Sequence, residues 1–403
     1  MSHENVDRLY WLAYAKIVQN QVGKLGEQNA IFLSTKNQRG PPVEPYNSAF
    51  TDYGIYHFAN QLLNSDNMFY APSSTNTYTG ALMAYLSWVD VGGNPTNAQM
   101  LDVMQKKKTF DAHQTAVMKA LKQANADYQD SLNMGMVPPG QKFSHLTMQV
   151  TASPPPPIAD AYNAYVDGTV LPAPTDLYTV AQFGSPDYRN IVSGWQRTAT
   201  NAPMRTQSFV LDLKEAQNAH DADFGHVKLD GDLGFSYGSI FSFGATGSSD
   251  VVEDSLSVKM TETNVKITMY WDDTAKATLT PGEWNISDPR GNYPNLKLGA
   301  PQSAKMLVLP NQLVLVSKLG YDVHFDGSIK DEFDKKVSNV KKVNGYVRIF
   351  GIPVSVGAQG SFETTTTHTG SWDGTTGTFS VKPTADAGYA TVLAVVGEKV
   401  RTF

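Results

Sequence analysis

The fold class of this chain is decided by the stretch Val265-Lys266-Ile267-Thr268-Met269-Tyr270-Trp271. Its large apolar side chains fall on every second residue, with lysine, threonine and tyrosine between them. Successive side chains of a β-strand point to opposite faces, so this period of two places the apolar residues together on one face. The stretch therefore predicts a strand with one buried face, which is typical of an antiparallel sheet.

The same period extends on both sides of this stretch, over residues 205–403. Denser apolar runs at 346–356 and 389–396 predict further strands, and turn residues such as Pro281-Gly282 separate them. Because no regular strand–helix alternation occurs, we expect an antiparallel β-sandwich-like domain and not a parallel sheet. The apolar residues expected in its core include Leu211, Val258, Ile267, Met269, Leu315 and Ile349.

One helix is expected to interrupt these strands, at residues 328–342. Ser328 is suited to cap its start, and Glu332 and Lys336 are spaced to form an ion pair on its surface. Phe333 and Val337 lie on its apolar face, so we expect both to pack against the sheet.

The N-terminal part has helical periodicity instead. Apolar residues recur at intervals of three and four over 5–24, 50–64 and 79–90, and most clearly over 96–134. The last segment is either one long helix or two helices that break near residues 106–109. These patterns predict a helical domain over residues 1–135.

The next segment, 136–204, is rich in proline and contains four consecutive prolines from Pro154 to Pro157. Such runs favour polyproline II, so we interpret the segment as a stiff connector, with a docking motif for another protein as the alternative. A short helix is expected near residues 187–197. The fold class is therefore α+β: a helical N-terminal region, a proline-rich connector and a β-rich domain at 205–403 that carries one inserted helix.

Composition excludes several classes of protein. The chain has 403 residues, a formal net charge of −6 and no cysteine. The absence of cysteine excludes disulfides, thiolate metal sites and cysteine nucleophiles. The acidic balance argues against a nucleic-acid partner. The N-terminal residues are polar and acidic, unlike a signal peptide, and no apolar run is long enough to span a membrane as a helix, so a cytoplasmic protein is expected.

Two segments contain residues that could carry chemistry. His220, Asp223 and His226 lie within seven residues, and their imidazole and carboxylate groups are ligands that zinc, iron or manganese accept. This spacing matches no established metal motif, so a polar loop is the alternative. Gly234-Phe235-Ser236-Tyr237-Gly238 matches the nucleophile-elbow pattern, but the following residues predict a strand where that pattern requires a helix.

The segment around the first predicted helix has more apolar surface than one helix face can cover. Tyr10, Trp11 and Tyr14 are residue types that dominate protein interfaces, so we expect them to form an association surface.

Three functional hypotheses follow. The first is a non-enzymatic binding or self-assembling protein with a homo-oligomeric or protein partner. The second is a membrane-active protein that inserts a β-hairpin, since the Ser- and Thr-rich residues 247–268 and part of 362–381 alternate polar and apolar side chains. The third is a metal-dependent enzyme that uses the loop from His220 to His226. No cofactor is indicated by the sequence.

Overall fold

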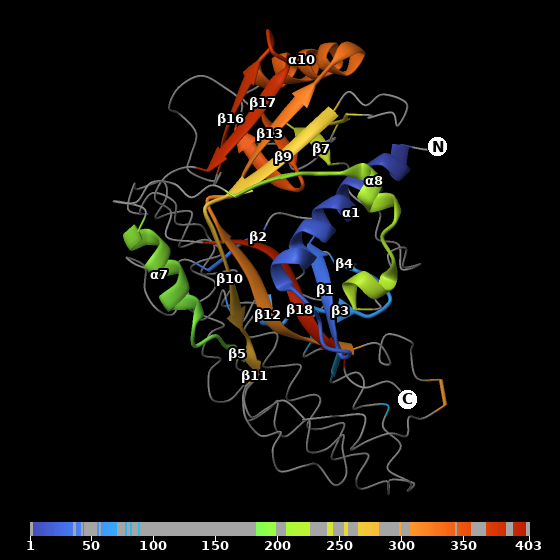
Figure 1. The fold of residues 1–403 in the computed structure, drawn as a ribbon, viewed down its shortest axis with the longest axis vertical. Helices are drawn as coiled ribbons and strands as arrows, with labels where there is room; N and C mark the ends of the chain where they lie inside the picture. Colours follow the sequence, from blue (N-terminus) through green and yellow to red (C-terminus); the bar gives the residue numbers. More distant parts are fainter. Residues whose placement is uncertain are drawn as a thin grey trace, which may run out of the picture.

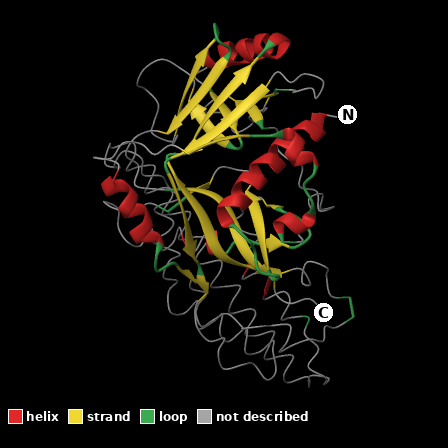
Figure 2. Cartoon of the chain, viewed as in Figure 1, coloured by secondary structure: helices red, strands yellow, loops and turns green. Residues whose placement is uncertain are grey.

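The structure, a computed structural model, describes residues 3–34, 38–41, 43, 55, 58–70, 77–78, 81–82, 88, 183–198, 207–225, 240–244, 254–256, 265–281, 298–299, 307–342, 345–355, 368–383 and 390–399. These residues form two large sheets with helices packed beside them (Figure 1). Strands outnumber helices (Figure 2), and most neighbouring strands are antiparallel. The mixed α+β composition expected from the sequence is confirmed.

The nine-stranded sheet contains the stretch with alternating apolar residues, Val265–Trp271. In order across the sheet, its strands are β6 (Gln207–Val210), β9 (Val265–Trp271), β13 (Gly320–Phe325), β17 (Thr378–Pro383), β16 (His368–Asp373), β15 (Ile352–Ser355), β14 (Tyr346–Ile349), β7 (Phe241–Gly244) and β8 (Asp254–Ser255). In β9, Ile267, Met269 and Trp271 are fully buried while Lys266 is exposed, as the period of two predicts. Helix α10 (Gly327–Lys342) lies over one end of this sheet (Figure 1).

The seven-stranded sheet joins segments from distant parts of the chain. Its main path runs β10 (Asp273–Thr278), β12 (Leu307–Ser317), β18 (Thr391–Lys399), β1 (Asn29–Ser34) and β4 (Phe69–Tyr70), with β2 (Gln38–Arg39) beside β18 and β3 (Leu63–Asn64) beside β12. A separate pair is formed by β5 (Phe183–Gly184) and β11 (Thr280–Pro281). Strand β18 lies between β12 and β1, so it is central to this sheet.

A continuous two-stranded ribbon connects the two sheets. Strand β9 runs into β10 through Asp272, and its partner β12 runs into β13 through Lys318 and Leu319. Lys318 has a left-handed backbone with a φ of 54°, and its Nζ lies 3.0 Å from the Asp272 carboxylate. The ribbon therefore changes sheets at one bend, which is held by an ion pair across it.

Helix α1 (His3–Val22) bridges the same two sheets. The Tyr10 hydroxyl donates to the carbonyl of Val265 in β9 at 2.9 Å, and the Tyr14 hydroxyl donates to that of Leu393 in β18 at 3.5 Å. On the other side of the ribbon, α7 (Tyr188–Thr198) packs beside β10, where the Trp195 indole donates to Asp273 at 2.9 Å.

Local expectations agree with these elements in most places. The helices predicted at 5–24, 187–197 and 328–342 are confirmed as α1, α7 and α10, and Leu211, Ile267, Met269, Leu315 and Ile349 are buried. The predicted helix at 50–64 is wrong at its end, because Leu63–Asn64 pairs with β12 as β3. Residue Val258, the segment 96–134 and the proline run 154–157 lie outside the described residues.

Candidate functional site

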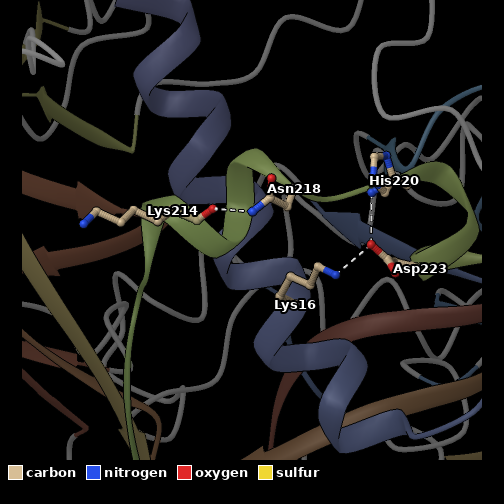
Figure 3. A network of polar contacts seen from close by, with 5 residues as sticks. All are labelled: Lys16, Lys214, Asn218, His220 and Asp223. Carbon is tan, nitrogen blue, oxygen red and sulfur yellow. Dashed lines mark hydrogen bonds and ion pairs between the residues drawn. The ribbon is translucent and has the colours of Figure 1, made fainter.

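The predicted metal loop is a short, well-anchored connection. Helix α8 (Leu213–Gln217) precedes it, and His220 is the N-cap of the short 3-10 helix η2 (Asp221–Phe224). The Asp223 carboxylate accepts a hydrogen bond from the His220 backbone N–H at 3.0 Å and one from Lys16 Nζ at 2.6 Å (Figure 3). Lys16 comes from α1, so this contact ties the loop to the helix that bridges the sheets.

The electrostatics of the loop are those of an ion pair. Partial burial opposes ionisation of Asp223, but the hydrogen bonds from Lys16 and His220 and the charge of Lys16 outweigh it and lower the pKa of this carboxyl. A second cation acts on the same loop, since Lys399 Nζ of β18 donates to the Gly225 carbonyl. Gly225 has a φ of 86°, and a Cβ there would lie 2.1 Å from the Asn29 carbonyl oxygen, so glycine allows the loop to lie directly on β1.

The structure therefore places His220 and Asp223 in one loop, but it does not bring them together as ligands. His220 is exposed, whereas the Asp223 side chain points toward Lys16 (Figure 3). Within the described part of the chain, no group of three or more His, Asp or Glu side chains is placed to hold a metal ion. His226 lies outside the described residues, so the three-residue metal site stays a prediction.

The predicted association surface is not exposed in this chain. Tyr10, Trp11 and Tyr14 are 2%, 2% and 6% exposed, and every residue from Leu9 to Ala15 is buried. The physical reason is the position of α1, which is covered by both sheets and by the segment that carries α8 and η2. The surplus of apolar surface on this helix is used inside the fold and does not indicate a partner.

Aromatic rings gather where α1 meets both sheets. Phe350 lies at their centre, with ring centroids 5.0 Å from Trp11, 5.2 Å from Tyr14 and 5.7 Å from Tyr321. Phe350 and Gly351 form the two-residue turn between β14 and β15, and both have positive φ, 47° and 75°. Such turns favour Asn and Gly, and a bulky residue in this conformation is strained. Packing of the Phe350 ring among the other three compensates for that strain.

A small cavity of about 10 Å³ lies against this cluster. Its walls include the rings of Trp11, Tyr14, Tyr321 and Phe350 and the polar residues Ser34 and Thr391. The Tyr321 hydroxyl is fully buried and meets no hydrogen-bonding partner among the described residues, whereas the Tyr14 hydroxyl makes a long bond to the Leu393 carbonyl. Burial raises the pKa of both phenols, so both stay protonated at neutral pH and present neutral hydroxyl groups.

The wall of the cavity is supported from behind by a buried histidine. His368, at the start of β16, is 1% exposed, and its Nε2 lies 2.7 Å from the carbonyl oxygen of Leu319, which lines the cavity. Burial lowers the pKa of His368 to about 4, although the hydrogen bond to Leu319 acts in the opposite direction. The imidazole is therefore neutral at pH 7.

Sequence reasoning missed this cluster as a site. The dense apolar run 346–356 was expected to supply strand, but Gly351 within it is the residue that permits the hairpin turn. The nucleophile-elbow match at 234–238 lies outside the described residues.

Comparisons with known proteins give no assignment. No family model, no curated protein and no solved structure matches this chain. None of the described helices has the length and apolar character needed to cross a membrane.

Proposed function

We propose that this protein acts by association with a second copy of itself, without catalysis, through the outer edge of strand β6. The observation that carries the proposal is that β6 ends the nine-stranded sheet and, in the part of the chain that the structure describes, pairs only with β9. The metal hypothesis receives less support, because the Asp223 carboxylate is bound to Lys16 and an ion would have to displace that lysine.

The register of β6 determines which backbone groups face outward. The Leu211 N–H donates to the Ile267 carbonyl at 3.0 Å, so Phe209, two residues earlier, also faces β9. In an antiparallel ladder the intervening residues direct their N–H and C=O groups the other way. Ser208 and Val210 therefore present backbone donors and acceptors at the edge of the sheet.

Among the described residues, this edge shows none of the features that usually prevent strand pairing. Its sequence, Gln207-Ser208-Phe209-Val210, contains no lysine, no proline and no other charged residue. Natural edge strands are commonly protected by such residues or by a covering element. Val210 is 51% exposed, which is unusual for a large apolar side chain among the described residues.

A second copy fits this edge because the strand is complementary to itself. With Phe209 on a two-fold axis, Ser208 of one copy lies opposite Val210 of the other. Each of these residues offers one donor and one acceptor, so two residues from each copy form four hydrogen bonds. The apolar Val210 side chains then lie on the same face of the joined sheet as the serines.

Sedimentation of the full chain at micromolar concentration tests the proposal. We expect an oligomer, and we expect Ser208→Pro to shift it toward monomer, because proline removes an outward donor and leaves the bonds to β9 intact. Ser208→Thr, which keeps the N–H, is the matched control and should remain oligomeric.

Two results would contradict this reasoning. A native protein that sediments as a monomer throughout the micromolar range removes self-association. An oligomer that persists in a folded Ser208→Pro variant shows that another surface joins the copies.

A further inference from the structure

We propose that the cavity beside Tyr14 and Tyr321 is a binding site for one water molecule, which hydrogen-bonds to the Tyr321 hydroxyl and connects α1 to both sheets.

The size of the cavity limits its occupant. A volume of about 10 Å³ is close to the smallest that accommodates a single water molecule. The Phe350 ring packs between Tyr14 and Tyr321, so the hairpin turn closes this side of the cavity.

The chemistry of the walls limits it further. None of the described residues that line the cavity carries a charge, so an ion would lose its hydration without compensation. The walls are not purely apolar either, since the hydroxyl-bearing residues Tyr14, Ser34, Tyr321 and Thr391 all contribute to them. A neutral molecule with both donors and acceptors fits this combination, and water has the required size.

The Tyr321 hydroxyl supplies an independent reason. Buried hydroxyl groups are nearly always hydrogen-bonded, because an unpaired one loses its contacts with solvent and gains nothing in return. Tyr321 is 0% exposed and its hydroxyl has no partner in the part of the chain that the structure describes. The Tyr14 hydroxyl donates to the Leu393 carbonyl at 3.5 Å, which is at the long limit, and its oxygen lone pairs remain able to accept a hydrogen bond.

The location gives the site its role. Tyr14 belongs to α1, Tyr321 to the nine-stranded sheet, and Thr391 to β18 of the seven-stranded sheet. A water molecule bound among them joins the helix to one strand of each sheet.

The direction in which Tyr321→Phe changes the Tm distinguishes a cavity that holds water from an empty one. If water is bound, Tyr321→Phe removes one of its partners, and we expect the Tm measured by calorimetry to fall by about 1–2 °C. If the cavity is dry, the same change removes an unsatisfied hydroxyl, and a rise in Tm would overturn the proposal. Tyr10→Phe is the matched control, because its buried hydroxyl already donates to Val265 and lies outside the cavity lining.

Coupling and direct observation complete the test. The Tm changes of Tyr14→Phe and Tyr321→Phe should be non-additive in the double variant, whereas those of Tyr10→Phe and Tyr321→Phe should add. A crystal structure of the native chain at a resolution near 1.5 Å should show a water oxygen within about 3.2 Å of Tyr321 Oη. Additive effects for the first pair, or a well-ordered cavity without that density, would overturn the proposal.

Discussion

At the scale of single residues, the interior of this protein contains titratable groups whose protonation state depends on burial. His368 is the clearest case. Its imidazole is enclosed behind the cavity wall, bound to the Leu319 carbonyl, and its pKa is lowered to about 4 because burial disfavours the charged ring. A histidine of this kind makes folding sensitive to acid, since the unfolded chain accepts the proton more readily than the folded one.

We expect the free energy of unfolding to decrease as pH falls from about 6.5 to about 4. The unfolded histidine titrates near 6.5 and the folded one near 4, so the contribution is complete above 6.5 and is lost across that window. The loss amounts to about 3 kcal/mol for a shift of this size. Urea unfolding of His368→Gln, which keeps a donor for Leu319, should show a flatter pH dependence there. Asp223→Asn is the comparison, because a lowered carboxyl pKa affects stability only at more acidic pH. An unchanged slope in His368→Gln would show that this ring is not the titrating group.

At the scale of elements, α10 shows how one aromatic residue attaches a helix to a sheet. Phe333 is fully buried, stacked on Phe325 with ring centroids 4.3 Å apart and tilted against Trp372 and Phe379 at 4.8 and 5.2 Å. Trp372 is held in turn by its indole N–H, which donates to Asp334 of the same helix at 2.6 Å.

Phe333→Ala should therefore destabilise the protein by about 3–5 kcal/mol, the usual cost of truncating a buried aromatic residue. Chemical unfolding measures this value. Asp331→Ala, an exposed position on the same helix, is the control and should change stability by less than about 0.5 kcal/mol. Equal effects at the two positions would contradict the packing described for Phe333.

The elements also show what could be predicted from sequence. Helices α1 and α10 and strand β9 follow from periodicity within 7–20 residues, so their limits and buried faces were predictable. The pairing of β1 with β18 could not be predicted, because no sequence pattern in either strand identifies its partner. The burial of Tyr10, Trp11 and Tyr14 was not predicted for the same reason. The apolar residues of a helix show that it must be buried, but not whether the residues that bury it belong to the same chain. The cavity is lined by residues from five separate segments of the chain, and no local sequence pattern predicts that these segments lie together.

At the scale of the whole molecule, two connections make the sheets depend on one another. The bent ribbon carries backbone hydrogen bonds from one sheet to the other, and α1 packs against both. Trp11 contributes directly to the second connection, because its ring contacts Phe350 at the β14–β15 turn and Phe69 of β4.

We expect Trp11→Ala to weaken both sheets together. Native-state hydrogen exchange should show that amides in β14 and in β18 lose protection by similar factors, with a total destabilisation of about 3–5 kcal/mol. Loss of protection in only one sheet would show that the sheets unfold independently.

The central position of β18 also determines when the seven-stranded sheet can be completed during translation. Strand β1 begins at Asn29 and its partner β18 at Thr391, a separation of about 360 residues. At a translation rate of about 5–20 residues per second, β1 is synthesised roughly 20–70 seconds before its antiparallel neighbour β18. During that interval its apolar side chains and unpaired edge are exposed to other nascent chains. Among the described strands, the edge of β1 that β18 covers is therefore the one that waits longest for its partner.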